Sequence, residues 1–356
     1  MKKTVLIITP SLNPKENISG ISSFSKILIN NNKSIYYVPF LVGKKDDDSR
    51  GVLWFLSNVI RPLRLLFFRL GKLDLVHFNI AFEPKSLIRD IFLLAVLKLR
   101  RIPIVLHVHG GRYMNKLDLE VPYVYRCLVK SFLINSRSIL VLSPLEKQKI
   151  LHSFPMFSSD NIYVVPNAVF VPNIIKKPAK NYIALLYLGR IDKAKGLKKI
   201  IDAVSCLYHA SIRFQLSICG VGSDMKWLKS IIPPELKGHI VFEGLVYGER
   251  KREILSSSDF YLLPSDYEGL PISLLEAMAF SVIPIVSAVG SIPEVVNSSN
   301  GRLVESVSDI VCAIEEIASS DKKDNIAAAA RQTILDNYSV QNQVKSINSI
   351  YNSIFK

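Results

Sequence analysis

Short apolar runs recur along this chain, and each is followed by a proline, a glycine or another polar or turn-forming residue. Between the runs lie longer segments in which apolar positions repeat with helical spacing. Unbroken apolar runs of this length are typical of parallel strands that are buried on both faces. The predicted strands are Val5–Thr9, Asp74–Phe78, Pro103–His109, Ser138–Leu142, Ile183–Leu188 and Asp259–Leu263. Alternating strand and helix signals predict a globular α/β protein.

The stretch Ser265–Pro284 reads as a loop, a helix and a strand. Pro271 suits the first helical position, where its missing N–H is no loss. A helix that begins directly after a strand presents N–H groups and the positive end of its dipole, which favours an anion there. Glu268 and Glu276 bracket this point. Because carboxylates repel phosphate, we expect them to accept hydrogen bonds from sugar or ribose hydroxyls.

A second cluster of candidate residues follows the predicted strand Ile183–Leu188. Gly189 makes a turn at the strand end, and Arg190 and Lys195 follow it. In open α/β sheets, ligands bind at the carboxyl ends of the strands. Arg190 can grip phosphate oxygens in a bidentate manner, and Lys195 can act as a point charge.

These motifs together resemble the signature of retaining glycosyltransferases of the GT4 type, which have the GT-B fold. Several spaced motifs in the right order carry the resemblance over nearly the whole chain. The matching segments are Val164–Ala168, Gly189–Arg190, Lys195–Gly196, Ile218–Gly222, Phe242–Gly244, Glu268–Ala279 and Gly290–Glu294. The resemblance implies two Rossmann-like domains that face each other across a cleft, and a metal-independent hexosyltransferase that retains anomeric configuration.

The resemblance also implies roles for single residues. Arg190 and Lys195 would stabilise the charge on a departing nucleoside diphosphate. Glu276 would hold the ribose and Glu268 the donor sugar, and His109 would lie near that sugar. The remaining predicted donor-binding residues are Gly20, Gly189, Gly269, Leu270 and Pro271.

The sequence departs from the family pattern at two places. Ile21 follows Gly20 where a glycine pair is common, and Phe280–Ser281 stands where a glycine is frequent. Simpler explanations stay open. The charged residues can be solvated or salt-bridged side chains, Gly20 can be a glycine at the start of a helix, and His109 can be a structural histidine. A GT-B epimerase or phosphorylase, and a non-catalytic GT-B scaffold, are the alternative functions.

Length and composition fit two domains in a reducing compartment. The chain has 356 residues, 49% of them hydrophobic, and its four cysteines are scattered. We expect an N-terminal domain over residues 1–172, a C-terminal donor-binding domain over 173–337, and a helix over 338–356 that packs back on the first domain. The sequence shows neither a signal peptide nor a transmembrane run of ~18 apolar residues.

The charge is strongly basic and unevenly distributed. The net charge is +15, of which residues 1–172 carry +13. Basic charge suits an anionic membrane, an acidic substrate or nucleic acid. Nucleic acid is disfavoured because the basic residues are mixed with aliphatic runs and not with aromatic stacking motifs. Asp46–Asp48 reads as a solvated acidic loop, so we expect neither a bound metal nor another cofactor.

Residues 50–72 contain five basic residues and no acidic one. On a helix, the basic side would oppose an apolar side rich in Leu and Phe, although Pro62 must kink it. Such a segment is typical of helices on membrane surfaces, and an ordinary core-packed helix is the alternative. The basic residues proposed for membrane or acceptor contact are Arg61, Arg64, Arg69 and Lys72.

A cationic helix on a basic domain suits an acceptor in the cytoplasmic leaflet of the bacterial inner membrane. A polyprenyl-diphosphate-linked glycan or a lipopolysaccharide intermediate would fit, and the protein would then be cytoplasmic and peripheral on that membrane. O-antigen, capsule or exopolysaccharide synthesis is the expected setting.

Overall fold

The computed structural model describes residues 2–13, 16–17, 19–43, 63, 73–111, 113–114, 117, 121–173 and 180–355. The chain forms two compact units. Unit 1 comprises residues 1–167 and 340–356, and unit 2 comprises residues 168–339. The predicted acidic loop Asp46–Asp48 and the predicted membrane residues Arg61, Arg64, Arg69 and Lys72 lie outside the described residues.

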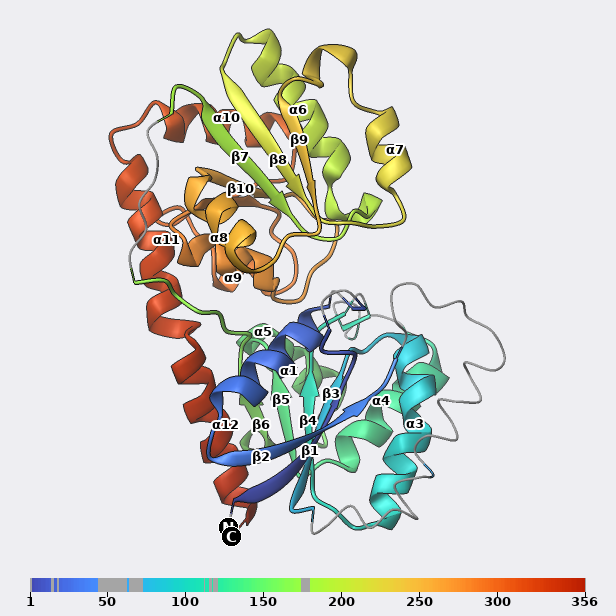
Figure 1. The fold of residues 1–356 in the computed structure, drawn as a ribbon. Coiled ribbons are helices and arrows are strands. Elements are labelled where there is room, and N and C mark those ends of the chain that lie inside the picture. Colours follow the sequence, from blue (N-terminus) through green and yellow to red (C-terminus); the bar gives the residue numbers. More distant parts are fainter. Residues whose placement is uncertain are drawn as a thin grey trace. The chain divides into compact units, whose positions relative to one another are not determined.

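Unit 1 is built on a parallel six-stranded sheet in the order β2-β1-β3-β4-β5-β6 (Figure 1). The strands are β1 (Lys3–Thr9), β2 (Ile35–Leu41), β3 (Leu75–Ile80), β4 (Ile104–Val108), β5 (Ser138–Val141) and β6 (Ile162–Val164). The helices are α1 (Gly20–Asn31), α3 (Pro84–Leu99), α4 (Tyr123–Ile134), α5 (Pro144–Ser153) and α12 (Val340–Phe355), with a short 3-10 turn η2 (Ser159–Asn161).

Both faces of this sheet are buried. Neighbouring residues of a strand point to opposite faces, and those of β1 belong to two different apolar clusters. Leu6 and Ile8 of β1 belong to one apolar cluster, which also contains buried residues of α3 and α4. Val5 and Ile7 belong to another, which also contains Tyr351 and other residues of α1 and α12. This arrangement explains why the strands read as unbroken apolar runs.

Unit 2 has a second parallel six-stranded sheet, in the order β12-β11-β10-β7-β8-β9. Its strands are β7 (Ile183–Leu188), β8 (Phe214–Cys219), β9 (Ile240–Gly244), β10 (Phe260–Leu263), β11 (Ile283–Val286) and β12 (Arg302–Leu303). Its helices are α6 (Leu197–His209), α7 (Met225–Ser230), α8 (Gly248–Ser257), α9 (Ile272–Ala279), α10 (Val307–Ala318) and α11 (Lys323–Asn337). Its 3-10 turns are η3 (Lys193–Lys195), η4 (Pro234–Leu236) and η5 (Ile292–Glu294).

Local sequence signals set several helix starts. Ser19 caps α1 by accepting a hydrogen bond from the Ser22 N–H at 3.2 Å. Ser306 and Asp309 form a reciprocal capping box at the start of α10.

No helix in the described part of the chain combines the length and the apolarity that a membrane crossing requires.

Candidate active site

The carboxyl ends of β7, β8 and β9 are joined by backbone contacts. The Gly189 N–H donates to Cys219 O at 3.0 Å, and the Gly220 N–H donates to Gly244 O at 2.7 Å. A Cβ on Gly220 would lie 1.8 Å from Gly189 O. A side chain at position 220 would therefore separate the loops, so glycine is required for this close approach.

Lys195 is placed by a tight turn that touches the end of β10. Asp192 caps the turn η3 through a 2.9 Å hydrogen bond from the Ala194 N–H. Gly196 follows with a left-handed φ of +75°, and a Cβ there would lie 2.0 Å from Pro264 O. This contact fixes Lys195 beside the loop that carries Glu268.

Lys195 and Glu268 form an ion pair. Lys195 Nζ lies 2.8 Å from Glu268 Oε1, and the same oxygen accepts a 2.9 Å hydrogen bond from Ser265 Oγ. The side chains are 20% and 11% exposed. A half-buried cation at the carboxyl edge of a parallel sheet is suited to hold an anionic ligand, with the carboxylate beside it for hydroxyl groups.

Helix α9 begins directly after this loop, with Pro271 at its N-cap. Leu274, Leu275 and Met278 are fully buried. The N-terminal N–H groups of a helix have no acceptor within it, so this end of α9 adds positive potential near the Lys195–Glu268 pair. Gly269 and Leu270 lie in the same loop.

Gly290 supports the loop that carries Glu268. Its φ is +58°, and a Cβ there would lie 2.1 Å from Glu268 O. The neighbouring Ser291 N–H donates to Gly269 O at 3.0 Å. The backbone after β11 therefore buttresses residues 268–269, which the spacing of the two segments in sequence does not reveal.

Glu276 pairs with a residue that sequence reasoning missed. Lys251 Nζ lies 2.6 Å from the Glu276 carboxylate, and the two side chains are 26% and 25% exposed. Lys251 lies in the charged run of α8, which reads as a solvated helix face. A long-range partner of this kind leaves no local signal.

Arg190 lies on the exposed side of the same edge. Its backbone carbonyl accepts a 2.5 Å hydrogen bond from the Tyr187 hydroxyl. Burial raises the pKa of Tyr187, so this hydroxyl stays protonated and can donate. The buried tyrosine thereby fixes the backbone at Arg190.

His109 and Gly20 belong to unit 1. Gly20 is the first residue of α1, and His109 directly follows β4. His109 Nε2 lies 2.8 Å from Asn79 Oδ1, and burial lowers the pKa of His109 to about 3. His109 is therefore a neutral imidazole at physiological pH.

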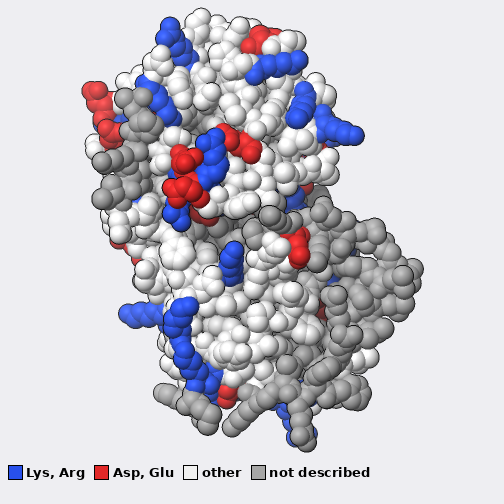
Figure 2. Space-filling model, in the orientation of Figure 1, with Lys and Arg blue, Asp and Glu red and all other residues white. Residues whose placement is uncertain are grey.

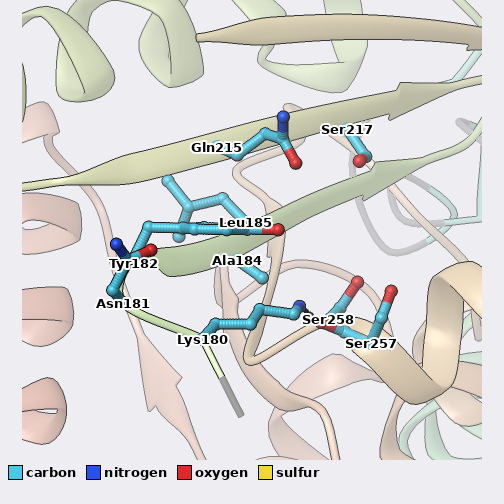
Figure 3. Close-up of a pocket in the computed structure, with 9 residues that line it drawn as sticks. All are labelled: Lys180, Asn181, Tyr182, Ala184, Leu185, Gln215, Ser217, Ser257 and Ser258. Carbon is cyan, nitrogen blue, oxygen red and sulfur yellow. Dashed lines mark hydrogen bonds between the residues drawn. The ribbon is translucent and has the colours of Figure 1, made fainter. Parts of the chain in front are cut away.

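Unit 2 also contains a hollow at the opposite end of its sheet (Figure 3). It is lined by Lys180, Asn181, Tyr182, Ala184, Leu185, Gln215, Ser217, Ser257 and Ser258. These residues come from the starts of β7 and β8 and the end of α8, whereas Lys195 and Glu268 follow the strand ends. The hollow is separate from the candidate active site.

Comparison with known proteins identifies the family. The family model described as Glycosyl transferases group 1 matches residues 172–351, which is just over half of the chain. The chain belongs to this family. It is a glycosyltransferase of the hexosyltransferase class, as the sequence motifs predict.

Relatives agree with this assignment. An uncharacterized glycosyltransferase of Methanocaldococcus jannaschii is 28% identical over 308 residues, which cover 80% of this chain and 77% of that protein. WcaL of Escherichia coli, named as a candidate glycosyltransferase of colanic acid biosynthesis, is 29% identical over 163 residues. That alignment covers 44% of this chain and 40% of WcaL, so it spans less than half of either protein.

Solved structures confirm the predicted GT-B fold. The sucrose-phosphate synthase of Thermosynechococcus elongatus superposes with a TM-score of 0.79 at 16% identity, over 99% of each chain. Anabaena HepE in complex with UDP-glucose superposes with a TM-score of 0.75 at 14% identity, over 98% of this chain and 99% of HepE. At such identities the likeness concerns the fold alone.

Proposed function

We propose that this protein is a retaining, metal-independent glycosyltransferase that uses a nucleoside diphosphate sugar. The main observation behind this proposal is the ion pair of Lys195 and Glu268, which lies beside the start of α9. Lys195 Nζ is 2.8 Å from Glu268 Oε1. It combines a cation for the diphosphate with a carboxylate for sugar hydroxyls. The complexes of HepE with UDP and with UDP-glucose support a nucleotide-linked donor.

The chemistry follows from where charge develops. When the bond between sugar and diphosphate breaks, negative charge grows on the leaving phosphate oxygens. Lys195, Arg190 and the N-terminus of α9 would stabilise this charge more in the transition state than in the ground state, which accelerates the reaction. Because cations of the protein fill this role, we expect no metal to be needed.

The carboxylates have separate tasks in this proposal. Glu268 accepts hydrogen bonds from the donor sugar. Its ion pair with Lys195 weakens when the ammonium group of Lys195 binds the phosphate of the donor. Glu276 accepts from the ribose hydroxyls, with Lys251 holding its carboxylate in place. Retention of anomeric configuration is part of the proposal through the resemblance to retaining enzymes.

The acceptor is proposed to be a lipid-linked glycan, either a polyprenyl-diphosphate-linked glycan or a lipopolysaccharide intermediate, at the cytoplasmic face of the inner membrane. The charge of +13 on residues 1–172 suits an anionic surface. The name of WcaL, which places that protein in colanic acid biosynthesis, supports a role in cell-surface polysaccharide synthesis.

Product analysis tests this function. The protein is incubated in EDTA with a panel of UDP-, GDP-, ADP- and CMP-sugars and a bacterial lipid extract, and the product anomer is determined by NMR. We expect one donor to be consumed, with its anomeric configuration kept in a lipid-linked product. An inverted product, or a free sugar phosphate or epimerised nucleotide sugar in its place, would contradict the proposal.

A further inference from the structure

The inner strand β8 carries polar side chains where apolar ones are usual. It lies between β7 and β9, and inner strands of a parallel sheet are normally apolar on both faces. Phe214, Leu216 and Ile218 are buried on one face of β8, whereas Gln215 and Ser217 on the other face are only half-buried. Positions that break the pattern of a fold without a gain in packing are expected at functional sites. Gln215 and Ser217 both line the hollow at the start of β7 and β8.

The hollow is wide enough for a small organic ligand. Ala184 of β7 pairs with Gln215 in the register of the sheet, and its small side chain leaves space beside the strand. Helix α8 ends at Ser257, and Ser257 and Ser258 line the hollow from its other side (Figure 3). The volume of the hollow is about 680 Å³. That value falls within the range of sites that take small ligands.

Side chains from separate segments direct hydrogen-bonding groups into this space (Figure 3). Tyr182 directly precedes β7, and Gln215 and Ser217 belong to β8. The side chains of these three residues form no hydrogen bond with any described residue. Each of the three is half-buried. A ligand can therefore bind their hydroxyl and amide groups without displacing an existing hydrogen bond.

The hollow carries positive charge. Among the described residues that line it, Lys180 is charged and none is acidic. The Lys180 ammonium donates to Ser257 O and lies 5.4 Å from the centre of the Tyr182 ring, which leaves N–H groups for a ligand. The nearby Asp259 carboxylate pairs with Lys323 at 3.0 Å. Burial lowers the pKa of Lys180, so an anion bound here would stabilise its charged form.

We propose that the hollow binds a small sugar phosphate, at a site separate from the candidate active site. Lys180 would contact the phosphate as a point charge. The Gln215 amide and the hydroxyls of Tyr182 and Ser217 can both donate and accept hydrogen bonds, as sugar hydroxyls do, and would hold the sugar. The proposal does not depend on the proposed function, because none of these residues belongs to the candidate active site.

Calorimetric titration tests whether such a ligand binds, and at which site. The probes are glucose 1-phosphate, glucose 6-phosphate and galactose 1-phosphate, with glucose and inorganic phosphate as controls. Because a sugar phosphate can also enter the candidate active site, wild type is compared with Lys195→Met. We expect at least one sugar phosphate to bind more tightly than either control, with affinities that agree within about twofold in the two proteins. No binding of any sugar phosphate, or loss of binding in Lys195→Met, would overturn the proposal.

Two variants separate the phosphate contact from the sugar contacts. Lys180→Met removes the cation and should weaken binding of the sugar phosphate by about tenfold or more. Gln215→Met keeps the size of the side chain and should weaken it by about threefold to tenfold, with the affinity for inorganic phosphate unchanged. Lys237→Met and Gln332→Met, at exposed positions of unit 2, are the matched controls and should bind like wild type. Wild-type affinity in both Lys180→Met and Gln215→Met would sink the proposal.

A spectroscopic label reports on the position of the ligand. The protein is produced with 3-fluorotyrosine, and the ¹⁹F signal of Tyr182 is assigned by its loss in Tyr182→Phe. We expect this signal to shift with the midpoint found by calorimetry, in wild type and in Lys195→Met alike. A Tyr182 signal that stays in place at saturation contradicts binding in the hollow, whether or not the protein transfers a sugar.

Discussion

At the scale of single residues, the candidate active site depends on pairs that are far apart in sequence. The motifs predict Lys195 and Glu268 separately, and the structure shows that they form an ion pair. That pairing could not be predicted from spacing, because it depends on the close approach of Gly196 to Pro264. The Glu276–Lys251 pair was missed because its members are 25 residues apart in sequence and leave no local signal.

Replacement of the lysine tests its role in charge stabilisation. Lys195→Met removes the cation and leaves Glu268 without its ion-pair partner, so we expect kcat to fall by about 10²–10³-fold, as for loss of a preorganised group. Lys198→Met removes an exposed lysine three residues away and should stay within about twofold of wild type. Steady-state kinetics with the preferred nucleotide sugar measure both. Near wild-type turnover of Lys195→Met would remove this residue from the site.

Gly290 allows a backbone-level prediction. Gly290→Ala places a Cβ 2.1 Å from Glu268 O at a positive φ, so the loop with Glu268 must move. We expect a loss of about 1–3 kcal/mol in stability and weaker nucleotide-sugar binding. Gly238→Ala is the control, because a Cβ there meets nothing within 4 Å. Urea unfolding and calorimetry give the two readouts, and equal behaviour of the two variants would disprove the buttressing role.

At the scale of elements, apolar runs predict the strands that lie inside the sheets. β7 has the predicted bounds, Ile183–Leu188. β2 was not predicted: it contains Pro39, which weakens a strand signal, and the structure places it at the sheet edge, where a proline is tolerated. His77 of β3, His107 of β4 and His109, which directly follows β4, form a cluster that periodicity alone does not predict.

This cluster makes stability depend on pH. Burial lowers the pKa of His77 and His109 to about 3 and lowers that of His107 well below its usual range. Since the folded-state pKa values lie below the unfolded value of 6.5, the unfolded chain binds more protons below pH 6.5, and stability falls as the pH drops from there towards 3. Between pH 7.5 and 5.0, His77 and His109 should each contribute a loss on the order of 2 kcal/mol.

A pair of variants isolates the contribution of the cluster. His107→Gln should reduce the difference in unfolding free energy between pH 7.5 and 5.0, because it removes one group whose pKa burial lowers in the folded protein. His152→Gln, at an exposed position of α5, should leave the difference unchanged. Urea titrations at the two pH values provide the comparison. An identical pH dependence in wild type and His107→Gln would contradict the buried neutral state of this histidine.

At the scale of the whole molecule, charge differs along the chain. Residues 1–172 carry +13 of the net +15. On the face drawn in Figure 2, some acidic and basic side chains lie next to one another. In unit 2, Arg250 of α8 pairs with both Glu243 and Glu253. Paired charges attract an anionic surface less than unpaired ones, so the sequence excess in residues 1–172 is the main basis for the proposed membrane contact.

Vesicle binding tests this membrane proposal. We expect the protein to sediment with anionic vesicles at low salt, to be released by high salt, and to ignore neutral vesicles. Exchange of Arg61, Arg64 and Arg69 for Gln should weaken binding, whereas the same exchange of the exposed Lys198, Lys226 and Lys237 should have little effect. Equal loss in both triple variants would show that only total charge matters, and no binding by wild type would contradict membrane contact.

The most direct test of the account is calorimetric titration of the protein with UDP, GDP, ADP and CMP in EDTA, for wild type and for Lys195→Met. We predict that one nucleoside diphosphate binds wild type without metal and that its affinity falls about tenfold or more in the variant, because a charged contact to phosphate is lost. Absence of binding, binding only with added Mg²⁺, or equal affinity for both proteins would contradict the proposed active site.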